Sequence, residues 1–157
     1  AIEFSENNNI SEICLVGGFE ILKIMRKYPL LRYYYNSQWA KTGNLKSLII
    51  ALKDQRDDLI ITYSDVIYDK SILNKTISSK QISLQYDSKW ASRYENRDKS
   101  SVEILFDKNN QELGEFTGAL FIPKALNKKI NQIVSDLAQK NINGTLLQLA
   151  QFFVKSF

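Results

Sequence analysis

Strand-length apolar runs alternate with amphipathic helical patterns along this chain, and the alternation limits the fold more than any other feature. An apolar run at residues 10–16 leads through two glycines into a helical pattern at 19–28, which stops at Pro29. Further strands are predicted at 31–35, 58–65, 81–86, 102–106, 111–113 and 115–122, and further helices at 45–53, 70–77, 124–139 and 145–155. This order predicts a mostly parallel sheet with helices on both faces and an antiparallel hairpin at 102–113.

The length and composition fit one such domain. The chain has 157 residues, of which 44% are hydrophobic and 24% charged, as is typical of a globular protein. We therefore predict a single α/β domain over residues 1–157, a Rossmann-like three-layer sandwich whose mixed sheet carries a hairpin insertion. Residues 1–7 have the pattern of the last turns of a helix, so we expect the domain to be incomplete. Its apolar runs are far shorter than the ~20 residues of a membrane span and no signal-peptide pattern is present, so a cytoplasmic location is expected.

Gaps in the composition exclude several kinds of active site. The sequence has no histidine, which rules out Ser-His-Asp and Cys-His nucleophile systems and the usual zinc sites. Its one cysteine, Cys14, lies in an apolar run, so we expect a buried, unreactive thiol. The net charge of +4 comes from Lys and Arg spread along the chain without a basic arm. A nucleic-acid partner is therefore not expected, and a local site for phosphates fits the charge equally well.

An acidic residue follows the apolar strand pattern at residues 58–65. Leu59, Ile60 and Ile61 lead towards Asp65, which is expected at the carboxyl end of the strand. Ligands of open α/β sheets bind just beyond the carboxyl ends of strands, so Asp65 is a candidate metal or substrate contact. The alternative is a structural aspartate that caps the strand or its turn.

Five short segments carry a family resemblance through their order and spacing. They are residues 10–19 with the turn Val16-Gly17-Gly18, the stretch from Asn36 through Asn44 to Ser47-Leu48, the segment Tyr63-Ser64-Asp65-Val66-Ile67, the residues Asp87, Trp90, Arg93, Tyr94 and Arg97, and the run Gly114-Glu115-Phe116-Thr117-Gly118. Together they resemble the sugar-phosphate and choline-phosphate nucleotidyltransferases, in particular the cytidylyltransferase-like branch also found fused to phosphoenolpyruvate mutases.

The resemblance implies a fold of the nucleotide-diphospho-sugar transferase type and a Mg²⁺-dependent nucleotidyl transfer. The nucleotidyl group would be CMP from CTP, and a small phosphate or phosphonate would accept it with release of pyrophosphate. Asp65 would be the Mg²⁺ ligand, a hard oxygen donor of the kind that this ion prefers. The nucleotide contacts would be Thr42, Gly43, Asn44 and Ser64. Asn44 equally suits a plain helix N-cap for residues 45–53.

The resemblance also implies a set of substrate contacts. Glu115 and Gly118 would face the acceptor, and the alternative for Glu115 is a salt-bridged surface residue. Arg93 and Arg97 are four residues apart, so on a helix they would share one face and could clamp a phosphate. Asp87 would be a further polar contact.

Two parts of the family pattern are not in these 157 residues. The resemblance implies a glycine-rich basic loop before Ala1 and a second acidic metal ligand after Phe157. The connection between residues 113 and 114 is also short for the family. We therefore expect these residues alone to be inactive, to bind CTP no tighter than about millimolar, and to aggregate through an open sheet edge. The alternative function is a non-catalytic remnant or interaction module on the same fold.

Overall fold

The computed structural model describes residues 10–96 and 98–156. The chain forms two compact units: unit 1 comprises residues 1–56 and 127–145, and unit 2 comprises residues 57–126 and 146–157. The helical pattern predicted at 1–7 and Arg97 lie outside the described residues. The single domain over residues 1–157 remains a prediction.

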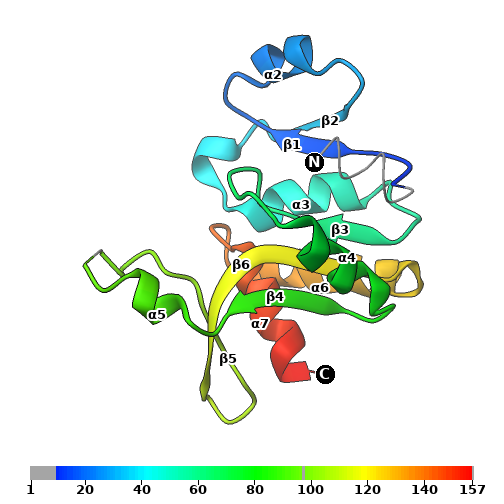
Figure 1. Ribbon diagram of the computed structural model, residues 1–157. Coiled ribbons are helices and arrows are strands. Elements are labelled where there is room, and N and C mark those ends of the chain that lie inside the picture. Colours follow the sequence, from blue (N-terminus) through cyan, green and yellow to red (C-terminus); the bar gives the residue numbers. More distant parts are fainter. Residues whose placement is uncertain (1–9, 97, 157) are drawn as a thin grey trace. The chain divides into compact units, whose positions relative to one another are not determined.

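Unit 1 contains the strand-helix-strand arrangement that the sequence predicts (Figure 1). Strand β1, Cys14–Gly17, pairs in parallel with strand β2, Arg32–Tyr35, and helix α2, Ile21–Lys27, connects them. The register places Gly17 opposite Tyr35. The Asn36 N–H extends this pairing by donating to the Gly17 carbonyl at 2.9 Å. The parallel pair therefore ends at Asn36, where the second segment of the family resemblance begins.

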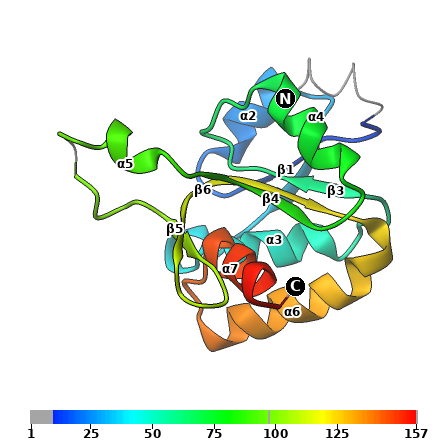
Figure 2. The ribbon, with the colours of Figure 1, turned by 60° about the horizontal axis from the view of Figure 1, so that its bottom comes forward.

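Two helices of unit 1, far apart in the sequence, pack against each other. Helix α3, Asn44–Leu52, contacts helix α6, Asn127–Lys140, which follows the short 3₁₀ helix η2, Lys124–Leu126. The two helices run side by side in Figure 2, and the Asn131 side-chain amide donates to the Leu52 carbonyl at 3.3 Å. The apolar faces supply the buried residues Leu45, Leu52, Ile130 and Val134. Both helices match the predicted apolar spacing, with boundaries that differ by one to three residues.

Helix α3 begins one residue earlier than predicted, which changes the role of Asn44. Its N-cap is Gly43, in an extended conformation with φ −74° and ψ 175°, and Asn44 is the first helical residue. The N-cap assignment of Asn44 was therefore wrong. The cause is a close backbone approach, because a Cβ at residue 43 would lie 2.2 Å from the Gly144 carbonyl oxygen. Glycine fits where the chain enters the helix beside this carbonyl.

Unit 2 contains a four-stranded sheet built around one long strand. Strand β6, Glu112–Ile122, pairs with β3, Leu59–Ile61, with β4, Ser83–Asp87, and with β5, Ile104–Phe106. Leu59 lies opposite Ile122, and Asp87 lies opposite Glu115. Figure 1 shows β6 between β3 and β4. The core of the unit includes Leu105, Phe116, Ala119, Leu120 and Ile122.

The strands of unit 2 run differently from the prediction. All three pairings with β6 are antiparallel, so the prediction of a mostly parallel sheet was wrong for the described strands, whose one parallel pair is β1 with β2. For β5 and β6 the reason is the predicted hairpin: the Asp107 carboxylate accepts from the N–H groups of Asn109 and Gln111 and turns β5 directly back into β6. A hairpin reverses chain direction, whereas a parallel neighbour needs a crossover. For β3 and β4 the direction depends on their long-range pairing with β6, which local patterns do not encode. The two strands predicted at 111–113 and 115–122 form one continuous strand, β6.

Three helices complete unit 2. Helix α4, Lys70–Ser78, is capped by the Asp69 side chain, which accepts from the Ser71 N–H at 2.8 Å. Helix α5 is a single turn, Trp90–Arg93. Helix α7, Leu146–Ser156, contacts β5 and β6, and its Gln151 side chain bonds both the N–H and the carbonyl of Phe106. Within residues 10–96 and 98–156, no helix is both long enough and apolar enough to cross a bilayer.

Candidate functional site

Asp65 lies on a loop rather than at the end of a strand. Strand β3 ends at Ile61, so the prediction that the strand reaches Asp65 was wrong by four residues. Residues 62–69, here called the Asp65 loop, connect β3 to helix α4, and Ser64 and Asp65 lie exposed at a bend within it. The loop therefore presents the candidate metal ligand to solvent.

Two tyrosines fasten the Asp65 loop to strand β6. The Tyr63 N–H donates to the Gly118 carbonyl at 3.2 Å, two residues beyond the end of β3 and in the same register with β6. The Tyr68 hydroxyl donates to the Thr117 carbonyl at 2.9 Å. The attachments lie on either side of Asp65, and burial raises the pKa of Tyr68, which also lies within electrostatic range of the Asp65 carboxylate. The loop is thus held at both ends against two adjacent residues of one strand.

The Tyr63 ring fills the space that a side chain at residue 118 would occupy. A Cβ at residue 118 would lie 2.2 Å from Cδ2 of Tyr63, and the backbone has φ +81°, in the left-handed region that favours glycine. Gly118 is buried. Glycine at this position therefore lets an aromatic ring pack onto the strand, which is an alternative to the close approach of a ligand.

Two half-buried glutamates near Gly118 each accept a tyrosine hydroxyl. Tyr63 donates to Oε2 of Glu103 at 2.8 Å, and Tyr94 donates to Oε1 of Glu115 at 2.9 Å. Burial raises the pKa of the Glu103 carboxyl, the Tyr63 hydrogen bond partly offsets this, and the nearby Glu115 charge raises the pKa further. The Glu115 charge therefore acts on Glu103, and the Tyr94 hydrogen bond shows that Glu115 is not simply a solvated surface residue.

The predicted substrate contacts Asp87 and Arg93 bind each other. Arg93 Nη2 contacts Asp87 Oδ2 in an ion pair, and Asp87 Oδ1 accepts from the Lys89 N–H at 2.9 Å. Helix α5 ends at Arg93, so the helical face that was expected to align Arg93 with Arg97 is not formed by this helix. The phosphate clamp by these two arginines remains a prediction.

Unit 1 contains the other predicted nucleotide residues, and Asn36 organises them. Asn36 is 2% exposed, and its side-chain amide donates to Thr42 Oγ1 at 3.1 Å and to Ser47 Oγ at 3.0 Å. Its Oδ1 accepts from the Gln38 N–H at 2.9 Å. One buried amide therefore fixes the loop that leads through Thr42 to Gly43 and the amino end of helix α3. At that end the N–H groups of Gly43 and Leu45 donate to the carbonyls of Ile142 and Gly144, at 2.9 and 3.1 Å.

The donor set around Asp65 fits one particular kind of metal site. Among residues 10–96 and 98–156, no group of three or more Cys, Asp or Glu side chains is arranged to hold a metal ion. Mg²⁺ does not need such a group, because it keeps several waters and is commonly bound by one or two carboxylates together with substrate phosphates. An exposed single carboxylate such as Asp65 fits this pattern and does not fit a metal cage made by protein alone.

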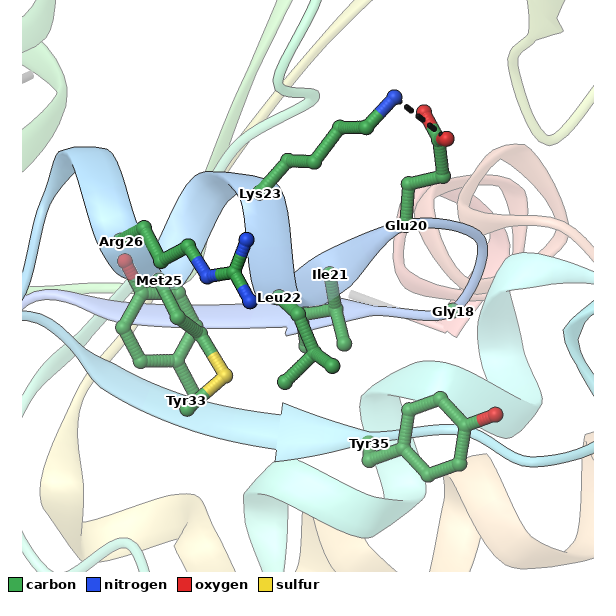
Figure 3. A pocket seen from close by; sticks show the side chains of 9 residues that line it. All are labelled: Gly18, Glu20, Ile21, Leu22, Lys23, Met25, Arg26, Tyr33 and Tyr35. Carbon is green, nitrogen blue, oxygen red and sulfur yellow. Dashed lines mark ion pairs between the residues drawn. The ribbon is translucent and has the colours of Figure 1, made fainter.

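Unit 1 also has a shallow hollow beside helix α2 (Figure 3). Its volume is about 630 Å³, and the side chains that line it include Leu22, Met25, Arg26, Tyr33 and Tyr35. The ion pair between Lys23 and Glu20 lies at its edge. None of the predicted site residues that the structure describes lines this hollow, so it adds nothing to the candidate site.

Comparisons with known proteins relate the chain to two cytidylyltransferases. No protein-family model matches the sequence. The chain is 28% identical over 112 residues to CTP:phosphoglutamine cytidylyltransferase of Campylobacter jejuni, with 65% of this chain and 44% of that protein covered. It thus spans less than half the length of that relative.

Among solved structures, the chain is similar to the CTP:phosphocholine cytidylyltransferase of Streptococcus pneumoniae. The TM-score is 0.57 at 13% sequence identity, with 99% of this chain and 70% of that chain covered. At this identity the likeness establishes a shared fold. The chain therefore has the α/β fold of that nucleotidyltransferase, and the prediction of an α/β fold is confirmed.

Four residues with structural roles at the site were absent from the predicted set. Tyr63 and Tyr68 lie inside or beside a recognised segment, and their aromatic character gave no sign of which backbone groups they bind. Asn36 opens another recognised segment and directly follows a predicted strand, which is a usable signal for a buried polar residue. Glu103 carries no local signal, because its partner Tyr63 is 40 residues away.

Proposed function

We propose that this chain is part of a cytidylyltransferase that transfers CMP from CTP to a small phosphate- or phosphonate-bearing acceptor and releases pyrophosphate. The observation that carries the proposal is the 28% identity over 112 residues to an enzyme named for CTP and phosphoglutamine. The fold shared with an enzyme named for CTP and phosphocholine supports it. The acceptor of this chain is proposed only as a class, because the two named acceptors differ.

The reaction suits a chain without histidine. An oxygen of the acceptor phosphate or phosphonate attacks the α-phosphorus of CTP, a new phosphoanhydride bond forms, and the bond between the α- and β-phosphates breaks. Pyrophosphate leaves with the bonding electrons. The attacking oxygen is already anionic, so no general base is required, and the enzyme contributes alignment and charge stabilisation.

The proposed roles follow the predicted assignments. Asp65 would hold Mg²⁺, which supplies charge neutralisation at the phosphates when bound. Ser64 and the segment Thr42, Gly43, Asn44 would contact the nucleotide, the latter beside the amino end of α3, whose dipole favours phosphate. Glu115 and Gly118 would bind the acceptor together with Asp87, Arg93 and Arg97.

The arrangement of unit 2 supports the roles of Asp65 and the acceptor residues. The Asp65 loop is attached to Thr117 and Gly118, and Tyr63 links it to Glu103, whose carboxylate lies within electrostatic range of Glu115. The loop that carries the proposed metal ligand and the residues proposed to bind the acceptor would thus be attached to one small sheet. A fixed relation between them is what in-line transfer between two phosphates requires.

A nucleotide panel tests the proposal. The full-length gene product is incubated with Mg²⁺, one acceptor at a time and CTP, UTP, ATP or GTP, and pyrophosphate release is followed. The acceptors are phosphocholine, phosphoglutamine, aminoethylphosphonate and a sugar phosphate. We expect release that needs both an acceptor and Mg²⁺ and is fastest with CTP. Absence of release with every pair would favour the non-catalytic module instead.

A further inference from the structure

The Asp65 carboxylate lacks fixed partners of its own. In the described part of the chain, no hydrogen bond or ion pair holds its oxygens, and the side chain is exposed. Catalytic or metal-binding side chains are normally oriented by surrounding groups. The direction of this carboxylate must therefore come from the backbone of the Asp65 loop and from whatever holds that loop.

Among the described residues of the loop, Tyr63, two residues before Asp65, makes several contacts that fix the loop to unit 2. Its N–H bonds to the Gly118 carbonyl, its ring lies against the Gly118 backbone, and its hydroxyl bonds to Glu103. The ring also meets Phe116 edge-on, with centroids 6.2 Å apart and planes at 71°. Backbone, ring and hydroxyl are therefore all fixed, which leaves Tyr63 little rotational freedom.

Glu103 is itself fixed to the same strand. Its carbonyl accepts from the Phe116 N–H at 2.7 Å, so its side chain begins at a defined point beside β6. A half-buried carboxylate near a second carboxylate is costly, and burial raises the pKa of Glu103 accordingly. A neutral residue would fill the same space at lower cost, so the carboxylate needs an explanation beyond packing.

We propose that Tyr63 and Glu103 are positioning residues that orient Asp65 for Mg²⁺ through the Asp65 loop. The proposal rests on the proposed function, in which Asp65 holds the ion. Glu103 acts through the Tyr63 hydroxyl, Tyr63 acts through two residues of backbone, and Tyr68 anchors the far end of the loop at Thr117. The pair is joined by a charge-assisted hydrogen bond, which is stronger than a neutral one.

The test compares three variants of the full-length protein. Tyr63→Phe keeps the ring against Gly118 and removes the hydroxyl, Glu103→Leu removes the acceptor, and Glu103→Gln keeps an oxygen that can accept. The control is Tyr33→Phe in unit 1, which also loses a tyrosine hydrogen bond, to the Tyr28 carbonyl at 2.6 Å, outside the proposed site. Thermal unfolding of each variant measures its stability separately.

Two measurements report on the metal. One is the Mg²⁺ concentration that gives half-maximal turnover, and the other is Mn²⁺ binding in the presence of CTP, followed by electron paramagnetic resonance. For Tyr63→Phe and Glu103→Leu we expect both constants to rise about tenfold or more, the usual scale when a group that orients a metal ligand is removed. For Glu103→Gln, both constants should lie closer to those of the wild-type protein. Tyr33→Phe should leave both constants unchanged.

The outcomes separate this proposal from the proposed function. If Asp65→Asn weakens Mn²⁺ binding while Tyr63→Phe and Glu103→Leu bind as wild type, Asp65 is the ligand and the positioning role is wrong. If Asp65→Asn also binds as wild type, the metal assignment itself fails. Should Glu103→Leu not fold, Tyr63→Phe and Glu103→Gln decide the matter, because wild-type constants for Tyr63→Phe overturn the proposal by themselves.

Discussion

The Tyr63 ring occupies the space that a side chain at residue 118 would need. Its Cδ2 and Cε2 atoms lie 2.2 and 2.8 Å from the Cβ position of residue 118, and Gly118 has φ +81°. One glycine thus meets two requirements, a left-handed backbone and a flat surface for an aromatic ring. The fit of the Asp65 loop onto β6 depends on both.

Gly118→Ala should therefore destabilise the protein markedly. The new methyl group must displace the Tyr63 ring and the backbone is strained for any L-residue, so we expect the free energy of unfolding to fall by about 1–3 kcal/mol. The free energy of unfolding of the variant and of the wild type is measured by urea denaturation. The control is Gly17→Ala, which should cost less: the three atoms nearest to its methyl all belong to the Ile21 side chain, the closest at 2.9 Å, and its φ lies outside the left-handed region. Equal losses in the two variants would contradict this account of Gly118.

Asn36→Ala should loosen the segment that leads to helix α3. Removing the buried amide leaves the Gln38 N–H without its acceptor and takes a donor from Thr42 and Ser47, so we expect a loss of about 1–3 kcal/mol in unfolding free energy. The matched control is Asn74→Ala on the exposed face of α4, which should change stability by less than about 0.5 kcal/mol. A small effect at Asn36 would mean that the buried network contributes little.

The raised pKa of Glu103 predicts a pH dependence of stability with a definite sign. The folded protein holds this proton more tightly than the unfolded chain, so the Glu103 contribution to unfolding free energy falls as pH rises from about 4.3 to the higher pKa of the folded state. Above that pKa the contribution is constant. Glu103→Gln removes this titration.

The measurement is urea unfolding of wild type and Glu103→Gln at a series of pH values. The difference in unfolding free energy, variant minus wild type, should increase with pH over that window and then level off. A difference that does not change with pH, or that decreases, would show that burial does not raise the pKa of Glu103 in the folded protein.

Asp65→Asn should impair turnover while preserving the fold. The side chain is exposed, so its replacement by an amide of the same shape should leave thermal unfolding almost unchanged. If the carboxylate holds Mg²⁺ at the phosphates, turnover should fall by at least ~10²-fold, the scale of one lost electrostatic stabiliser. Asp136→Asn, an equivalent change at an exposed position of α6, is the control and should retain full activity. A near-normal rate for Asp65→Asn would remove the central residue assignment.

Local patterns were sufficient to predict most elements of this fold. The run that ends at Gly17-Gly18, the stop at Pro29 and the apolar spacing of α6 each depend on neighbours within one turn or one strand, and all appear in the structure. The hairpin from β5 to β6 was likewise predicted from its turn residues. Strand direction was not, because it depends on which distant strand β6 joins.

The site was predictable only as a set of segments. The order of Asp65, Asp87 and Glu115 along the chain marked the regions that unit 2 brings into one sheet and its loops. The contact of Tyr63 with Glu103 and Gly118 joins residues 40 and 55 positions apart, and no periodic pattern encodes such a pairing. The N-cap at Gly43 likewise depends on the distant Gly144 carbonyl.

The most direct test of the proposed function is to identify the product of the full-length protein by ³¹P nuclear magnetic resonance. The protein, Mg²⁺ and CTP are mixed with phosphocholine, phosphoglutamine, aminoethylphosphonate or a sugar phosphate. The account predicts, for at least one acceptor, paired phosphoanhydride signals of a CMP-linked product together with an equal amount of pyrophosphate, and neither when Mg²⁺ is removed. Unchanged CTP and acceptor in every mixture, with folded protein, would contradict it.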